Sequence, residues 1–216
     1  MSDPDRLRIT EIFYSLQGEA KTAGQPTVFI RLTGCPLRCA YCDTAYAFQG
    51  GEWMTITAIL AEVKKYDTKF VTVTGGEPLA QKNCDVLLRS LCDRDYSVSL
   101  ETSGALSIKN VDLRVSRVVD VKTPDSQESA KNLIENFQFL SDHDQLKFVI
   151  CSRRDYEWSK EFIQKYKLKG KCEIWFSSSF EQLPPRQLAE WILEDQLSVR
   201  FQMQLHKLLW ADEPGR

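Results

Sequence analysis

The chain has 216 residues, 43% of them hydrophobic and 27% charged, and a formal net charge of −2. This is enough apolar material for one substantial core, so we expect a single domain spanning 1–216. The charge balance, without runs of like sign, argues against a nucleic-acid or membrane partner. No apolar stretch reaches the roughly 20 residues needed to span a bilayer, and the polar start lacks the apolar region of a secretory signal. We expect a soluble, cytoplasmic protein.

Strand-like and helix-like patterns alternate along the chain. Short apolar runs predict six core strands, at 27–32, 70–74, 96–100, 117–121, 146–150 and 173–176. Apolar residues at helical spacing predict helices near 56–63, 84–91, 129–138 and 155–166. Pro184 and Pro185 open a further helix, because proline is tolerated in a first turn. The run 199–204 fits a last strand or an extended tail.

This alternation predicts βαβ units and a parallel sheet, hence an α/β fold. A closed barrel of eight such units takes about 250 residues, so we expect a single-domain, partial (open) TIM-like barrel with about six parallel core strands. An N-terminal extension, 1–26, and a C-terminal tail, 199–216, would pack on it. In such sheets the chemistry lies at the carboxyl ends of the strands, which is where the motifs below fall.

The first predicted strand runs into a cysteine triplet, Cys35, Cys39 and Cys42, with the spacing C-x₃-C-x₂-C. Ordinary [4Fe–4S] clusters take four cysteine ligands, so three leave one iron open for a substrate or cofactor. The alternative is a structural zinc site, which needs a fourth ligand. The two histidines, His143 and His206, are distant in sequence and neither is paired with a cysteine. The other four cysteines are scattered and are interpreted as small buried hydrophobes.

The second predicted strand ends in Gly75-Gly76-Glu77-Pro78. Alone, this could be a plain strand-to-helix turn, although paired glycines also let a ligand approach the backbone. Together with the cysteine triplet and Tyr41, it resembles the radical S-adenosylmethionine (SAM) superfamily. That resemblance implies a [4Fe–4S] cluster whose open iron holds SAM, a Gly-Gly-Glu-Pro segment that helps bind the SAM amino group, and a 5′-deoxyadenosyl radical that abstracts hydrogen from the substrate.

Further motifs stand in order along the chain: Ser-Leu-Gln-Gly-Glu (15–19), Cys-Asp-Thr (42–44), Glu-Thr-Ser-Gly (101–104), Asp-Val-Lys-Thr-Pro (120–124) and Gln-Leu-His-Lys (204–207). The set is similar to the 7-carboxy-7-deazaguanine synthase family of queuosine (7-deazapurine) biosynthesis. This resemblance implies a lyase that contracts 6-carboxy-5,6,7,8-tetrahydropterin to 7-carboxy-7-deazaguanine and ammonia. It also implies hydrogen abstraction at C6, catalytic use of SAM, a need for Mg²⁺, a flavodoxin-type or ferredoxin-type electron donor, and a homodimer.

The same resemblance implies roles for individual residues. No side chain is assigned as catalytic, because the cluster and SAM generate the radical. The substrate would contact Leu16, Gln17, Gly18, Arg31, Thr74 and His206. SAM would contact Tyr41, Gly76, Glu77, Ser103, Asp120, Val121, Lys122, Ser177 and Ser178, while Cys35, Cys39 and Cys42 bind the cluster and Thr44 binds Mg²⁺.

Several of these residues also have a simpler structural interpretation. Arg31 could form a surface ion pair, His206 could be structural, Asp43 could cap a loop, and the serines could serve in turns and caps. The chain also departs from the family pattern. It has Ala20-Lys21 where many relatives carry a glycine, and Asp-Val-Lys where some carry Ser-Pro-Lys, so Lys122 transfers most cleanly.

Two other functions remain open from the residues alone. A small glycyl-radical-enzyme activase shares the cluster and Gly-Gly-Glu-Pro, and the 15–19 and 42–44 segments argue against it. A structural zinc-binding protein would instead be colourless and indifferent to SAM.

Overall fold

The computed structural model describes residues 5–180, 182–211, 213 and 215. Within these ranges, nine strands form one sheet in the order β3-β1-β2-β4-β5-β6-β7-β8-β9. Seven run parallel: β2 (Pro26–Leu32), β4 (Phe70–Gly75), β5 (Ser97–Thr102), β6 (Ser116–Val121), β7 (Gln145–Ile150), β8 (Glu173–Ser178) and β9 (Arg200–Gln202). At one edge β1 (Arg6–Leu16) pairs antiparallel with β2, and β3 (Glu52–Thr55) pairs antiparallel with β1.

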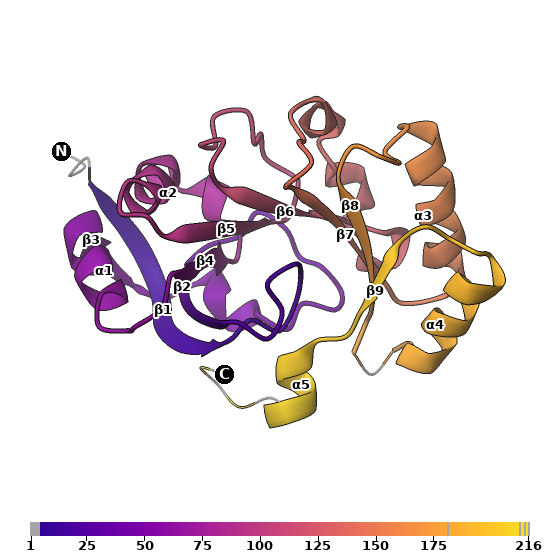
Figure 1. The fold of residues 1–216 in the computed structure, drawn as a ribbon, viewed down its shortest axis with the longest axis horizontal. Coiled ribbons are helices and arrows are strands. Elements are labelled where there is room, and N and C mark those ends of the chain that lie inside the picture. Colours follow the sequence, from indigo (N-terminus) through magenta and orange to yellow (C-terminus); the bar gives the residue numbers. More distant parts are fainter. Residues whose placement is uncertain (1–4, 181, 212, 214, 216) are drawn as a thin grey trace.

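The sheet curves into an open arch (Figure 1). Helices α1 (Ile56–Val63), α2 (Cys84–Cys92), α3 (Arg153–Lys165) and α4 (Pro185–Glu194) lie outside it, and the short α5 (Leu205–Trp210) lies at its open side. This arrangement confirms the partial barrel expected from the sequence. No helix in the described ranges is long and apolar enough to cross a membrane.

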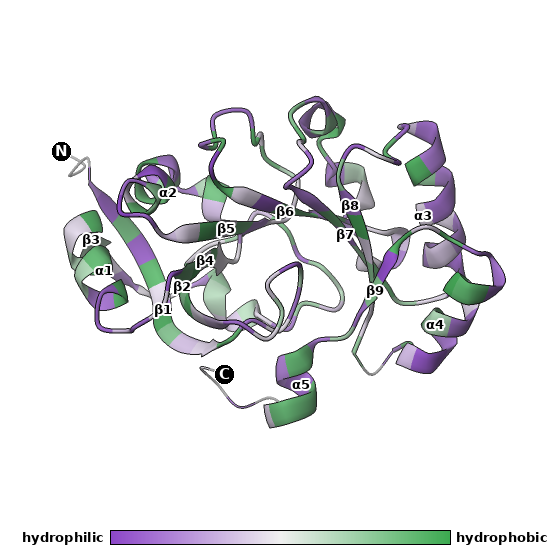
Figure 2. Cartoon of the chain, viewed as in Figure 1, coloured by the Kyte–Doolittle hydropathy of each residue, from purple (hydrophilic) through white to green (hydrophobic). Residues whose placement is uncertain are grey.

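The core lies between the sheet and the outer helices. Alternate strand residues such as Val71 and Val73, and Leu146 and Phe148, are buried in it with apolar residues of α1 to α4. Because side chains alternate between the two faces of a strand, the residues in between face the concave side. The strands in Figure 2 accordingly mix hydrophobic and hydrophilic colours along their length. The polar faces of several neighbouring strands are thereby brought together inside the arch.

The six predicted core strands are confirmed, and 199–204 contains the short strand β9. Three of the four helices predicted from spacing, and the one opened by the prolines, are also confirmed. The helix expected near 129–138 is wrong: this segment forms 3-10 turns at Ser129–Lys131 and Ile134–Gln138. The extension 1–26 contributes β1 to the sheet. Within the predicted tail 199–216, residues 212, 214 and 216 lie outside the described residues.

Candidate active site

A cavity of about 530 Å³ opens on the concave face of the sheet, toward the carboxyl ends of the strands. Most of the side chains predicted to bind cluster, cofactor or substrate share its wall. They are Leu16, Gln17, Gly18, Arg31, Cys35, Cys39, Tyr41, Cys42, Thr44, Thr74, Gly76, Ser103, Asp120, Lys122, Ser177, Ser178 and His206. The cavity therefore gathers residues that are up to 190 positions apart in the sequence.

The cysteine loop follows β2 and rests against the end of β4. The backbone N–H of Gly76 donates to the carbonyl of Leu32, and that of Glu77 donates to the carbonyl of Gly34 at 2.8 Å. A Cβ on Gly76 would lie 2.3 Å from the Gly34 oxygen and 2.8 Å from the Cβ of Cys35. A side chain at this position would therefore push the cysteine loop away from the sheet, which explains why the sequence needs glycine here.

The three thiols of this loop face one cavity. Burial is the largest influence on each, raising the pKa of Cys35 and Cys42 and that of Cys39 to about 11. The thiols also disfavour one another's ionisation, since each lies within electrostatic reach of another. Binding of iron would reverse this preference, because metal ligation requires the thiolate.

The three thiols are the kind of donor that an iron–sulfur cluster takes. Among the described residues, no three His, Cys, Asp or Glu side chains converge closely enough to hold one metal ion. A tetrahedral zinc site needs such convergence. In a [4Fe–4S] cubane each cysteine binds a different iron, so the sulfurs stand further apart. Three free thiols that line one cavity are chemically suited to the cluster.

Glu77 and Val121 are the predicted cofactor-binding residues that do not line the cavity. The Glu77 carboxylate is fully buried and accepts hydrogen bonds from the hydroxyls of Thr102 and Ser103 and from the backbone N–H of Ser103 at 2.7 Å. It also accepts from the N–H of Leu79. Its side chain thus fixes the end of β5 behind the cavity wall, while Val121 is packed in the hydrophobic core.

A second group of polar side chains lies beside the cysteine loop. The Lys122 ammonium is 3.0 Å from the Asp120 carboxylate and 5.7 Å from the centre of the Tyr41 ring. The hydroxyl of Tyr41 and Oδ1 of Asp120 are buried and have no hydrogen-bond partner within the described part of the chain. Buried polar atoms are nearly always paired, so these two are ready to bind a polar ligand next to the thiols.

Thr44 and Asp43 extend this wall with oxygen atoms. The Thr44 hydroxyl donates to Oδ1 of Asp43 at 2.7 Å, and Nε2 of Gln204 lies 3.5 Å from Oδ2. Burial opposes ionisation of Asp43, but the Thr44 bond and nearby cations outweigh it and lower the pKa. Asp43 is thus a carboxylate beside a hydroxyl, two hard oxygens of the kind Mg²⁺ prefers.

Arg31, on β2, is another residue that lines the cavity. Its Nε donates to the Glu11 carboxylate at 2.7 Å, and its guanidinium is 5.8 Å from the ring centres of Phe13 and Tyr46. Arg31 therefore does form an ion pair, as the alternative interpretation of its position in the sequence predicts. This pair uses one of the five N–H donors of arginine. Because the side chain also lines the cavity, the remaining donors can bind a second anion while Glu11 orients the guanidinium.

Gly18 and His206 meet at the open side of the arch. The backbone N–H of Leu205 donates to the carbonyl of Gly18 at 3.0 Å, and a Cβ on Gly18 would lie 2.4 Å from Nδ1 of His206. Burial lowers the pKa of His206, although Glu19 and Asp43 oppose this shift. The glycine of the 15–19 segment is therefore required for the imidazole of α5 to reach the cavity.

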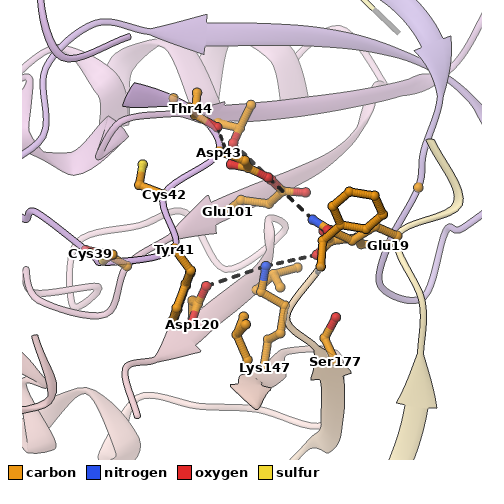
Figure 3. A pocket seen from close by; sticks show the side chains of 18 of the residues that line it. Glu19, Cys39, Tyr41, Cys42, Asp43, Thr44, Glu101, Asp120, Lys147 and Ser177 are labelled. Atoms are coloured by element: carbon orange, nitrogen blue, oxygen red, sulfur yellow. Dashed lines mark hydrogen bonds and ion pairs between the residues drawn. The ribbon is translucent and has the colours of Figure 1, made fainter. Parts of the chain in front are cut away.

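The sequence reasoning missed three ionisable residues that Figure 3 shows in the wall: Glu19, Glu101 and Lys147. The Lys147 ammonium is 2.9 Å from the Glu19 carboxylate and 3.5 Å from that of Asp120. Burial disfavours both charges, yet their mutual attraction prevails. It lowers the pKa of Glu19 and raises that of Lys147 well above its usual value.

The pKa of Glu101 is shifted in the opposite direction to that of Glu19. Burial, and then the neighbouring Glu19 charge, raise its pKa, although its carboxyl accepts a hydrogen bond from the Thr74 hydroxyl at 2.9 Å. Nε2 of Gln17 lies 3.4 Å away. A signal for Glu101 and Lys147 was present in the sequence. Lys147 is a charged residue within the predicted strand 146–150, between apolar residues that face the core, and Glu101 directly follows the predicted strand 96–100.

Comparison with known proteins agrees with this geometry. The model of the radical SAM superfamily matches residues 29–176. The 7-carboxy-7-deazaguanine synthase of Chlorobaculum tepidum is 47% identical over 213 residues, covering 97% of each chain. That of Koribacter versatilis is 43% identical over 222 residues, covering 96% of this chain and 98% of the relative.

Solved structures are similar in fold. The crystal structure of QueE from Escherichia coli has a TM-score of 0.77 and 24% identity, covering 93% of this chain and 95% of that one. Streptococcus suis SuiB has a TM-score of 0.56, with 79% of this chain and 47% of that chain covered. The superfamily match spans more than half of the chain, and the sequence relatives are similar from end to end. The chain therefore belongs to the radical SAM superfamily and, within it, to the family of the 7-carboxy-7-deazaguanine synthases.

Proposed function

We propose that this protein converts 6-carboxy-5,6,7,8-tetrahydropterin to 7-carboxy-7-deazaguanine and ammonia, a step of queuosine biosynthesis. The observation that carries the proposal is one cavity lined both by the three thiols of the cysteine loop and by Arg31, Gln17 and Glu101. End-to-end similarity to the 7-carboxy-7-deazaguanine synthases supports it. The first group suits a cluster with SAM, and the second suits a small polar substrate that bears a carboxylate.

Membership of the superfamily implies a [4Fe–4S] cluster and SAM. When bound, they supply the radical that removes hydrogen from the substrate, at C6 in this proposal, with SAM recovered afterwards. Cys35, Cys39 and Cys42 would hold the cluster. The unpartnered Tyr41 hydroxyl and Asp120 oxygen, together with Ser103, Lys122, Ser177 and Ser178, would bind and orient SAM.

A second group of lining residues would bind the pterin. Arg31 would bind its carboxylate through a forked pair of hydrogen bonds, held in direction by Glu11. Gln17, Gly18, Thr74 and His206 would read the amide-like edge of the ring. Glu101, whose pKa is raised by burial and by the neighbouring Glu19 charge, would face the pterin with a carboxyl group that accepts hydrogen bonds from Thr74 and Gln17.

Thr44 would be the protein ligand of Mg²⁺, with Asp43 orienting the bound waters. Mg²⁺ commonly keeps several waters and takes only one or two protein ligands. The proposal also includes a one-electron donor of the flavodoxin or ferredoxin type and a homodimeric assembly. These parts rest on the family resemblance.

An anaerobic assay tests the proposal. The protein is purified without oxygen, analysed for iron, sulfide and zinc, and supplied with SAM, Mg²⁺, a reductant and the pterin. We expect 7-carboxy-7-deazaguanine to form, Cys39→Ala to abolish it, and Cys92→Ala to leave it intact, because Cys92 is buried in the outer helix α2. Cleavage of SAM without conversion of the pterin would overturn the substrate, and a colourless zinc protein would overturn the whole proposal.

A further inference from the structure

The middle of the cysteine loop is held by a turn from a distant part of the chain, residues 123–128, here called the brace turn. The backbone N–H of Arg38 donates to Oε1 of Glu128 at 2.5 Å, and that of Ala40 donates to the carbonyl of Ser126 at 3.1 Å. Cys39 stands between Arg38 and Ala40. Both peptide neighbours of this cluster ligand are therefore fixed by one turn.

The brace turn is itself anchored to the outer layer of the fold. Asp155, fully buried at the start of α3, accepts hydrogen bonds from the Thr123 hydroxyl at 3.0 Å and the N–H of Asp125 at 3.0 Å. Within the turn, the N–H of Glu128 donates to the Ser126 hydroxyl at 3.1 Å. The position of the Glu128 carboxylate is thus tied to α3 and, through it, to the sheet.

Arg38 fastens the same stretch from the other side. Its side chain is exposed, and Nη1 donates to the carbonyls of Cys35 at 2.9 Å and Leu37 at 2.6 Å. Its guanidinium lies 4.2 Å from the centre of the Phe48 ring. The N–H of Leu37 is 3.4 Å from the sulfur of Cys35. The loop between the first two cysteines is therefore closed upon itself, and the bond to Glu128 joins this closed unit to the brace turn.

We propose that Glu128 is a positioning residue for the iron–sulfur cluster. By holding the Arg38 amide, it fixes the backbone on which Cys39 is carried before iron is bound. A carboxylate acceptor makes this a charge-assisted hydrogen bond, stronger than one between neutral groups. A loop ordered in advance loses less conformational freedom when three thiolates converge on the cluster. This inference rests on the cluster-binding part of the proposed function and is independent of the pterin.

Two variants and a matched control test it. Glu128→Ala removes the acceptor, Glu128→Gln keeps an oxygen acceptor without the charge, and Glu161→Ala removes an exposed glutamate on α3 away from the loop. Hydrogen exchange of peptides covering 37–41 is measured on metal-free protein. Release of iron to a chelator is measured anaerobically on reconstituted protein, so neither readout needs turnover.

We expect Glu128→Ala to speed both amide exchange in 37–41 and iron release by about tenfold, the effect of about one net hydrogen bond. Glu128→Gln should retain most of the wild-type behaviour, and Glu161→Ala all of it. Identical exchange and iron release in Glu128→Ala and Glu161→Ala would overturn the proposal. Equal losses in the Ala and Gln variants would also overturn it, because a side-chain oxygen able to accept the Arg38 N–H would then make no difference. A failure of pterin conversion alone would affect only the substrate assignment.

Discussion

Arg31 is a residue whose environment makes a specific prediction about substrate binding. It stands between the rings of Phe13 and Tyr46 and is directed by Glu11. Hydrogen bonds to charged groups contribute about 1.5–3 kcal/mol, so Arg31→Leu should raise KM for the pterin by about 10- to 100-fold. Arg31→Lys should recover only part of the loss, because an ammonium lacks the planar fork. Steady-state kinetics check this.

The controls for Arg31 separate binding from folding. Iron content should be unchanged in both variants, and Arg186→Leu, at an exposed position on α4, should leave KM as it is. If Arg31→Leu kept the wild-type KM, Arg31 would serve only as the partner of Glu11 in an ion pair, which is the alternative hypothesis from the sequence.

Lys147 makes a prediction about stability. Its replacement by methionine removes the cation shared by Glu19 and Asp120, whose side chains are 12% and 15% exposed, although Asp120 keeps its pair with Lys122. Breaking a largely buried pair in this way costs up to about 3–5 kcal/mol. Lys65→Met, at an exposed pair with Glu62, should change the free energy of unfolding by less than about 1 kcal/mol. Chemical denaturation of the metal-free proteins at neutral pH measures both. Comparable small losses in the two variants would contradict the buried network.

The pH dependence follows from the same pair. The pKa of Glu19 is lowered in the folded protein, so its contribution is present above the unfolded value of 4.5 and is lost as the pH falls through the folded pKa. The pKa of Lys147 is raised, so its contribution is present below 10.5 and is lost as the pH rises through the folded pKa. Wild type should therefore lose stability at both extremes of pH. Lys147→Met should lose both contributions of this pair, because the lowered pKa of Glu19 depends on the charge of Lys147.

The motifs predict which residues lie near the cavity, but not where each side chain points. That the three cysteines and Gly76 lie together at one cavity was predictable from their motifs, while their binding of cluster and SAM stays a prediction. Glu77 was expected to touch SAM, yet the structure places its carboxylate beneath Thr102 and Ser103. A motif identifies a position near a site, but it does not tell on which side of the wall the side chain lies.

At the scale of elements, Gly76 controls how the cysteine loop rests on β4. Gly76→Ala would place a methyl group 2.3 Å from the Gly34 oxygen, so the loop must move and iron content should fall below half of the wild-type level. Gly170→Ala is the control. It lies at φ +84 with open space around it, so it should lower stability through backbone strain but retain iron. Full iron loading in Gly76→Ala would show that the loop tolerates the shift.

Elements with a strong apolar period were predicted correctly, and those shaped by side-chain hydrogen bonds were not. The segment 129–138 has apolar residues at helical spacing, but Asn132 and Asn136 bond to backbone groups elsewhere. Nδ2 of Asn136 donates to the carbonyls of Gly104 and Leu106, and its Oδ1 accepts from the N–H of Ile108. Asparagine side chains that replace local backbone bonds disfavour a regular helix, and the spacing of apolar residues does not reveal this.

For the whole molecule, the decisive feature is that the two ends of the sequence close the arch together. The N–H of Ala20 donates to Oε1 of Gln202, Nε2 of Gln204 donates to Glu19, and the N–H of Leu205 donates to Gly18, at 2.9, 2.9 and 3.0 Å. Such pairings between distant segments cannot be read from local patterns. The partial barrel was therefore predictable from strand and helix periodicity, whereas the closure of the arch by these two segments was not.

Because part of this closure lies in the short segment after Met203, truncation there should separate cleavage of SAM from conversion of the pterin. The shortened protein keeps the Gln202 bond to Ala20 and the whole cysteine loop, but it loses His206 and the wall formed by α5. We expect iron content and SAM cleavage to persist, while kcat/KM for the pterin falls at least about 100-fold through lost positioning. His206→Ala, which keeps α5, should give a smaller loss of the same kind. Loss of iron on truncation would instead make the C-terminal segment part of the cluster site, and unchanged turnover would remove α5 from the substrate site.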